Sequence, residues 1–245
     1  MRVGVISDVH GNRPAFEAVL SDMPDVHAYV CAGDIVGYNP WPAECIARIR
    51  DLEAPTVLGN HDREVARGGG FGFNSMATAG VKYAREVLED DDRDWLGALP
   101  THRTEFGGRV RMVHGHPNDP DRYTYPDEFS ARMIEGSGEG DGEDAADRHP
   151  DVLVLGHTHV QGHRVFEEGV VMNPGSVGQP RDGDPRAAYA LLELGDPEDP
   201  TDMGTPGDVP TVEERRVEYD VESVVDAVEE AGLPKRIGTR LREGR

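Results

Sequence analysis

The sequence predicts an α/β fold, an αββα sandwich of four layers in which two mixed sheets pack together and helices flank them. Its first half alternates short apolar runs with helix-like segments, which is the rhythm of βαβ units. Its second half carries pairs of strand-like segments around Gly-containing turns, which are typical of hairpins. Since 37% of the 245 residues are hydrophobic, one large core can form, and we expect a single domain over residues 1–245.

The elements of the first half follow from apolar spacing and from proline. Cys45, Ile46 and Ile49 recur at helical spacing, and Pro14 and Pro42 stand where proline is well tolerated, in the first turn of a helix. The predicted strands are Arg2–Ile6, Ala28–Ala32 and Pro55–Leu58, and the predicted helices are Arg13–Asp22, Pro42–Leu52, Ala77–Glu89 and Asp94–Leu99.

The second half reads mainly as strands. A Gly-Gly pair at 107–108 separates the first two, as in a hairpin. The predicted strands are Thr101–Phe106, Arg109–Val113, Val152–Leu155, His163–Glu167, Val170–Met172, Ala187–Leu194 and Val212–Tyr219, and a helix is predicted over Val221–Ala231. Two stretches rich in Gly, Asp, Glu or Pro, at about 135–147 and 195–210, are expected to be flexible acidic surface loops.

The charge of the chain restricts its partners and its environment. The sequence holds 47 Asp plus Glu against 25 Lys plus Arg, a formal net charge of −22. Such a field argues against a broad nucleic-acid or anionic-membrane surface. It also disfavours the compact state through self-repulsion, which is screened near 1 M salt, where the Debye length is about 3 Å. We therefore expect a halophilic source.

The N-terminus and the cysteines indicate a cytoplasmic protein. Met1 and Arg2 run directly into a strand-like segment, so no signal peptide is expected. No apolar run approaches the roughly 20 residues that span a bilayer, so no membrane partner is expected. Cys31 and Cys45 lie in apolar segments and fit a reducing compartment without a structural disulfide. The sequence is silent on oligomeric state.

Polar side chains follow five of the predicted strands, often with a glycine beside them. In open α/β sheets, ligands bind outside the carboxyl ends of the strands, so these groups are expected to meet in one crevice. The candidates are Asp8 and His10, then Asp34, then Asn60 and His61, then His114 and His116, and finally His157 and His159.

The residue types in these clusters indicate divalent metal ions. Imidazole and carboxylate suit Mn, Fe, Co, Ni or Zn, and the absence of cysteine excludes a structural zinc finger. Seven ligands fit two ions that share one carboxylate. Asp8 and His10, two apart in an extended chain, are expected to face the same way. A turn between His157 and His159 would split them between the two ions.

Together these motifs resemble the signature of the calcineurin-like metallophosphoesterases. The matching residues are Asp8-x-His10, Gly33-Asp34, Gly59-Asn60-His61-Asp62, His114 and Gly156-His157-Thr158-His159. The segment from Asn173 to Gly178 is similar to the small prokaryotic phosphodiesterase branch. Other segments, such as Gly33 to Tyr38, resemble a microbial subgroup described as diadenosine-tetraphosphatase-like or protein-phosphatase-like. The resemblance covers nearly the whole chain except the acidic loops.

This resemblance implies a ligand set, a catalytic residue and a reaction. One ion would take Asp8, His10, Asp34 and His159, and the other would take Asp34, Asn60, His114 and His157. His61 matches the family's catalytic histidine near the leaving group. We expect two divalent ions, Mn²⁺ in the first place with Ni²⁺, Co²⁺, Fe²⁺ or Zn²⁺ also suited, and hydrolysis of a phosphate ester by a metal-activated hydroxide. The substrate is a small phosphate ester or a nucleotide.

Two alternatives and two further residues complete the prediction. The first alternative function is hydrolysis of dinucleoside polyphosphates, which would use the same metal chemistry. The second is a noncatalytic scaffold, which is the role of one eukaryotic relative that lacks the catalytic histidine. The protein-phosphatase pattern Asp-Arg-Gly is absent after Asp34, where Val36-Gly37-Tyr38 stands instead. Arg181 and His116 are candidate substrate contacts.

Overall fold

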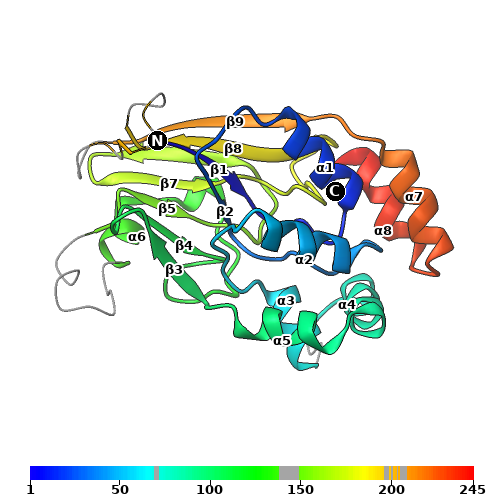
Figure 1. Cartoon of the computed structure of the whole chain (residues 1–245). Helices are drawn as coiled ribbons and strands as arrows, with labels where there is room; N and C mark the ends of the chain where they lie inside the picture. The colour runs from blue at the N-terminus through cyan, green and yellow to red at the C-terminus, as the bar shows by residue number, and fades with distance from the viewer. Residues whose placement is uncertain (69–71, 138–148, 196–198, 200, 203, 205–208) are drawn as a thin grey trace.

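The computed structural model describes the chain except residues 69–71, 138–148, 196–198, 200, 203 and 205–208. Two sheets form its centre (Figure 1). The first has the order β2-β1-β8-β9, built from Ala28–Cys31, Arg2–Ile6, Ala187–Glu193 and Thr211–Val217. The second has the order β3-β4-β5-β7-β6, built from His102–Glu105, Val110–Val113, Val152–Val154, Gly169–Asn173 and Gly162–Phe166. Each sheet mixes parallel and antiparallel pairs, which confirms the predicted fold class.

Helices lie outside both sheets and beyond the strand ends (Figure 1). The α-helices are α1 (Arg13–Asp22), α2 (Pro42–Asp51), α3 (Asn60–Arg67), α4 (Ser75–Val87), α5 (Asp90–Ala98), α6 (Ala131–Glu135), α7 (Val221–Glu230) and α8 (Lys235–Thr239). Two short 3₁₀ helices cover Pro126–Glu128 and Arg240–Glu243. Among the described residues, no helix combines the length and the apolar character that crossing a membrane requires.

Alternation along the strands produces the four layers. In β5, Val152 and Val154 belong to the core between the two sheets, whereas Leu153 belongs to a cluster with Ile134 of α6. In β8, Leu192 faces the same inter-sheet core, and Tyr189 belongs to the cluster beneath the helices on the opposite side. Since successive side chains of a strand point to opposite faces, the central strands of each sheet are buried on both sides, whereas the edge strands β3, β6 and β9 are partly exposed.

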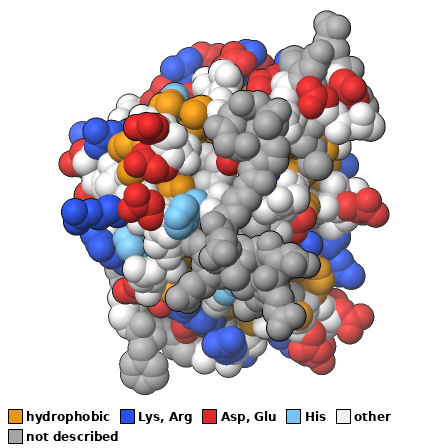
Figure 2. Space-filling view, turned by 90° about the vertical axis from the view of Figure 1, so that its left-hand side faces the viewer, with side chains coloured by type: hydrophobic (Ala, Val, Ile, Leu, Met, Phe, Trp, Pro, Cys, Tyr) orange, Lys and Arg blue, Asp and Glu red, His pale blue; other side chains and the backbone are white. Residues whose placement is uncertain are grey.

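The surface carries charges of both signs. Figure 2 shows acidic and basic side chains of the described residues in small neighbouring groups on one face, with apolar side chains between them. Many pair with each other, such as Arg242 with Glu222 at 2.6 Å and Lys235 with Glu229 at 2.8 Å. Exposed pairs of this kind stabilise a fold by about 0–1 kcal/mol each and lose strength in salt.

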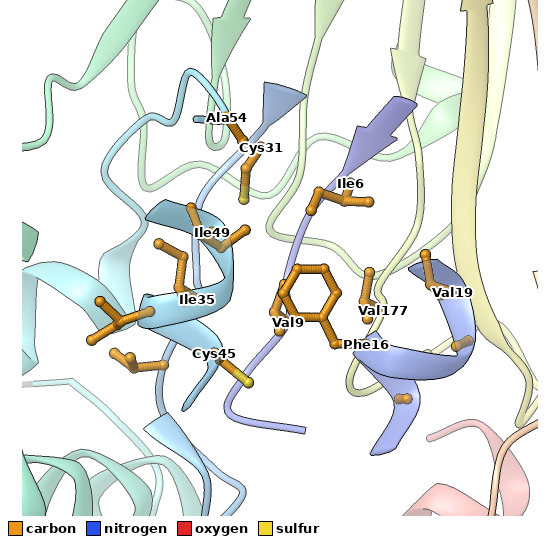
Figure 3. Packing of buried hydrophobic residues seen from close by; sticks show 14 of the residues in the cluster. Ile6, Val9, Phe16, Val19, Cys31, Ile35, Cys45, Ile49, Ala54 and Val177 are labelled. Atoms are coloured by element: carbon orange, nitrogen blue, oxygen red, sulfur yellow. The ribbon is translucent and has the colours of Figure 1, made fainter. Parts of the chain in front are cut away.

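The core under α1 and α2 holds the segments that carry the polar clusters. Phe16 of α1 and Ile49 of α2 belong to one buried cluster with Val9, Ile35 and Val177 (Figure 3). Val9 stands between two predicted ligands and Ile35 follows a third, and both side chains are fully buried. Packing therefore fixes the backbone on which the ligands stand, because buried side chains at this density tolerate little displacement.

Several local expectations are wrong. Pro55–Leu58 is no strand: Thr56 forms only an isolated bridge to Cys31, and the chain then enters α3, which was not predicted. Helices α6 and α8 were also missed, since each has only five residues and little periodicity. Most of the predicted acidic loops at 135–147 and 195–210 lies outside the described residues. Both cysteines are buried and unpaired, as expected.

Candidate metal centre

The polar clusters stand on strained turns rather than on extended chain. The residues with left-handed φ angles include Asp8, His10, Asp34, His157 and His159, with φ between 50° and 68°. The expectation that Asp8 and His10 sit in extended chain is therefore wrong. Left-handed backbone is unfavourable for residues other than glycine and persists only where the surrounding structure imposes it, which is common at functional sites.

Backbone hydrogen bonds impose these turns by joining the clusters directly. The amide of Asp8 donates to Gly33 O and that of His10 donates to Asp34 O, both at 2.9 Å. Gly33 has a φ of 94°, and a Cβ there would lie 2.8 Å from the amide nitrogen of Gly59. The glycine in this position is needed because the two loops touch through their backbones.

Asp62, next to the predicted catalytic histidine, is a structural residue. Its carboxylate accepts from the backbone amides of Asp34 at 2.8 Å, Val36 at 3.1 Å and Gly59 at 3.2 Å. Burial, reinforced by the Asp34 charge, raises the pKa of Asp62 to about 7. Asp62 thus ties the start of α3 to the loop after β2.

Four histidines share one arrangement, in which one ring nitrogen contacts a backbone carbonyl. The contacts are His10 Nδ1 with Val36 O at 3.0 Å, His114 Nδ1 with Ala32 O at 2.7 Å, His157 Nε2 with Asp121 O at 3.1 Å and His159 Nδ1 with Gln179 O at 2.6 Å. A carbonyl only accepts, so each of these nitrogens donates, and in the neutral ring the opposite nitrogen keeps its lone pair. This arrangement orients histidines that bind metals.

The lone pairs and carboxylates converge in overlapping groups. One group holds Asp8, His10 and His159, and a second holds Asp34, His114 and His157, with the ligand atoms of each group within 4.8 Å of one another. A third group of the same size, His10, Asp34 and His61, shares one residue with each of these two. Asp34 Oδ2 lies 3.6 Å from His10 Nε2 and 3.3 Å from His114 Nε2, so it faces both groups. The chemistry of these donors fits two divalent ions that share Asp34.

Asn60 completes the second group. Its Oδ1 lies 3.2 Å from His114 Nε2, at the first residue of α3. The residues brought together are thus Asp8, His10, Asp34, Asn60, His114, His157 and His159, all at most 8% exposed. As expected, the turn at Thr158 separates His157 and His159 into different groups.

Electrostatics differ sharply among these histidines. Burial lowers the pKa of His10 and of His159 well below the usual value. Burial also depresses the pKa of His114, but the charge of Asp34 outweighs it and raises that pKa to about 10. The neighbouring histidines in turn hold the pKa of Asp34 well below its usual range, although burial opposes this. A metal cation bound between Asp34 and His114 would take the place of the proton that these two side chains hold in the metal-free protein.

His61 lies beside the ligands in an aromatic slot. Its ring centroid is 4.6 Å from that of Tyr38 and 4.7 Å from that of Phe73, and 4.8 Å from His10. Its Nδ1 is buried without a hydrogen-bond partner among the described residues. Burial lowers its pKa to about 4, so the ring is neutral at pH 7. Ring packing therefore orients the imidazole, while Asp34 Oδ1 accepts from the backbone amide of His61 at 2.8 Å.

Arg181 adjoins this slot, whereas His116 does not. The guanidinium of Arg181 donates to Tyr38 Oη at 3.2 Å and to Gln179 Oε1 at 2.8 Å, and its backbone amide donates to His159 O at 3.1 Å. His116 Nδ1 accepts from the Asn118 amide at 3.2 Å in a separate turn. Together with Ser130, Arg132 and Met133, that turn lines a pocket of about 190 Å³ whose lining includes none of the candidate metal ligands.

Sequence reasoning missed the aromatic residues of the site. Tyr38 and Phe73 flank His61, and Tyr123 stacks on His157 with 4.0 Å between ring centroids. Only Tyr38 had a signal, since it follows Gly37 in the segment after Asp34. Phe73 and Tyr123 stand in loops without periodicity, so only the tertiary structure brings them here.

Comparison with known proteins decides the family. The family sequence model for the calcineurin-like phosphoesterase superfamily domain matches residues 1–196 of the chain. The chain belongs to this superfamily. The crystal structure of a metallophosphoesterase from Sphaerobacter thermophilus matches all of this chain and all of its own, with a TM-score of 0.75 and 34% identity. The predicted family is thereby confirmed.

Two curated proteins are also similar to this phosphoesterase chain. An uncharacterized protein of Methanocaldococcus jannaschii is 31% identical over 265 residues, which cover 99% of this chain and 98% of the relative. The phosphodiesterase YfcE of Escherichia coli K12 is 26% identical over 205 residues, which cover 79% of this chain and 88% of YfcE.

Proposed function

We propose that the protein is a dinuclear metal-dependent hydrolase of phosphate esters. The observation that carries this proposal is the set of four histidines whose outer nitrogens are bound to carbonyls while their inner nitrogens face Asp8 and Asp34. Divalent ions held there by the seven candidate ligands would supply Lewis acidity and lower the pKa of water. Membership of the phosphoesterase superfamily and similarity to the phosphodiesterase YfcE support the same reaction class.

His61 is the proposed proton donor to the leaving oxygen. Its ring is next to the ligands, and its buried Nδ1 lies against Gly37, so Nε2 is the nitrogen that we propose faces the substrate. With a pKa of about 4 the ring is neutral in the free protein. A phosphate anion bound beside it raises that pKa because opposite charge favours the protonated form, so the ring would take up a proton from the solvent when the substrate binds and then donate it to the leaving oxygen. General acid catalysis of this kind contributes typically 10²–10⁴-fold.

Arg181 is the proposed phosphate contact. Its guanidinium is held by two oxygens, one of them the phenol of Tyr38 that also packs on His61. Because Nε and Nη2 donate to Gln179 and Tyr38, Nη1 is the nitrogen that we propose binds the phosphate through a charge-assisted hydrogen bond. His116, in its separate turn, is the weaker candidate and remains a prediction.

The decisive test compares metal content and turnover in one set of proteins. We expect purified protein reconstituted with Mn²⁺ to bind about two ions per chain and to hydrolyse p-nitrophenyl or bis(p-nitrophenyl) phosphate. His61→Ala should keep both ions and lose most turnover. Metal binding without turnover in the wild type would instead support the scaffold alternative, and a chain that bound no ion would overturn the proposal.

The same preparations address the finer alternatives. A matrix of Mn²⁺, Ni²⁺, Co²⁺, Fe²⁺ and Zn²⁺ against mono- and diesters would identify the metal, for which we propose Mn²⁺. Dinucleoside polyphosphates belong in the matrix because their hydrolysis requires the same centre. The assays should be run at high salt, since the charge of −22 supports our proposal of a salt-rich cytoplasm. The two buried, unpaired cysteines support the proposal that this cytoplasm is reducing.

A further inference from the structure

A strip of three nearly parallel rings leads from the candidate metal centre to the solvent. Tyr123 stacks on His157 with 4.0 Å between centroids and 29° between planes. Tyr125 follows at 6.4 Å from Tyr123 with 18° between planes. Tyr123 is 48% exposed and Tyr125 43% exposed, so both outer residues of the strip are open to solvent.

The segment that carries these tyrosines is anchored to the centre. The carbonyl of Asp121 accepts from His157 Nε2, and its carboxylate accepts from Arg63 Nη2 at 2.9 and 3.0 Å. The amide of Tyr125 donates to Glu128 Oε2 at 2.9 Å. Thr124, which lies between the two tyrosines in the sequence, is only 1% exposed. The rings are therefore held in place before a ligand arrives, which reduces the entropy lost on binding.

The position of the strip relates it to the proposed reaction. His157 would bind the metal through its inner nitrogen, so a phosphate at the centre lies beside the first ring of the strip. Tyr38 and Arg181 lie on the other flank, around His61. A group attached to that phosphate can leave the buried centre along the tyrosines, where it meets flat apolar faces and phenol hydroxyls.

We propose that Tyr123 and Tyr125 form a subsite for a planar aromatic group of the substrate, so that the protein prefers aryl or nucleoside phosphates to phosphates of nonaromatic alcohols. This inference rests on the proposed function of the metal centre. Stacking on an aromatic side chain is tolerant of ring identity, since every flat ring presents a π face. The subsite therefore selects for a ring, and the metal centre selects for the phosphate.

Binding of nonhydrolysable ligands to the Mn²⁺-loaded protein tests the subsite without turnover. The probes are the phosphonate analogues of AMP and of ribose 5-phosphate, which differ only in the base, and phenylphosphonate with methylphosphonate, which differ only in a ring. By calorimetry we expect the AMP analogue to bind about tenfold more tightly than the ribose analogue. A similar preference for phenylphosphonate would show that any aryl group suffices, and a preference confined to the AMP pair would restrict the subsite to nucleosides.

Variants assign the preference to the two rings. Tyr125→Ala, which leaves the His157 contact intact, should reduce the tenfold ratio to about two and leave the affinity for the ribose analogue unchanged. Tyr123→Phe and Tyr125→Phe should retain the ratio, because stacking needs no hydroxyl. Val87→Ala removes another exposed apolar side chain, 45% exposed on α4, and serves as the control.

Equal affinities for the paired probes in the wild type would overturn the proposal, as would a ratio that survives Tyr125→Ala. Hydrolysis of p-nitrophenyl phosphate by the same preparations separates this failure from failure of the proposed function. A protein that turns over the ester but ignores the ring has the metal chemistry without the aromatic subsite.

Discussion

Gly37→Ala should inactivate the protein without removing its metal ions. Gly37 has a φ of 92°, and a Cβ built on it would lie 3.1 Å from His61 Cγ and 3.2 Å from His61 Cβ, with Nδ1 closer still. These atoms belong to the rigid base of the ring, which is held between Tyr38 and Phe73. His61 must therefore shift, and a displacement of about 1 Å in a catalytic group can cost about 10²-fold in rate.

Gly108→Ala is the matched control. Gly108 has the same φ of 92° in the β3–β4 hairpin, and nothing lies within 4 Å of a Cβ there. Both variants thus carry a similar backbone strain of about 1–2 kcal/mol, and only one carries the clash. For a chain of this length each should lower Tm by a few degrees.

The assay measures kcat with p-nitrophenyl phosphate, bound Mn²⁺ and Tm for both variants. We expect kcat to fall about 10²-fold in Gly37→Ala alone, while both variants bind the wild-type amount of metal. If Gly37→Ala kept kcat within about twofold of Gly108→Ala, the position of His61 would not control turnover. If it lost its metal ions, the slot would serve the metal centre instead.

Four further predictions follow from the same contacts. Asp34→Asn should weaken binding of both ions together, because Asp34 faces both ligand groups; titration calorimetry that shows loss of one site only would contradict a shared ligand. Arg181→Gln should raise KM several-fold more than it lowers kcat, and an unchanged KM would remove Arg181 from the phosphate site. Tyr38→Phe should raise KM more weakly, since it removes only a 3.2 Å hydrogen bond to Arg181 and keeps the aromatic ring. In chelator-treated protein, the His61 pKa of about 4 lies below the value near 6.5 in the unfolded chain, so the unfolded chain takes up a proton first as the pH falls. The free energy of unfolding should therefore decrease between about pH 6.5 and pH 4, by on the order of 3 kcal/mol more than in His61→Asn. Urea-unfolding profiles of the two proteins that run parallel over this range would contradict the prediction. The midpoint of thermal unfolding should rise from low to molar KCl, because a net charge of −22 is then screened, and a higher midpoint in low salt would argue against a halophilic protein.

The family and the candidate ligands were accessible from the sequence because they are local patterns. Asp8 and His10 follow a short apolar strand within four residues, and His157 and His159 follow another within five. A strand end is a position that hydrophobic patterning locates well, so the ligands could be found by looking just beyond each apolar run. The one strand that failed, Pro55–Leu58, still directed attention to Asn60, because the chain there runs beside β2 before α3 begins.

The backbone at the site could not be read from the same patterns. Asp8 and His10 adopt left-handed φ angles because amides and carbonyls of the loop after β2 bind them there. That constraint comes from residues more than twenty positions away in the chain. An isolated segment of this composition would favour extended structure, which is what the sequence predicted.

By itself, then, the sequence determined the fold class, the family and which side chains are suited to bind metal ions, since apolar periodicity and motif spacing are properties of neighbouring residues. The tertiary structure alone decided which ring nitrogen of each histidine faces inward, how His61 is oriented, and that two loop tyrosines border the centre. Those features depend on carbonyls and rings contributed by distant segments, and such groups become neighbours only when the sheets and helices pack.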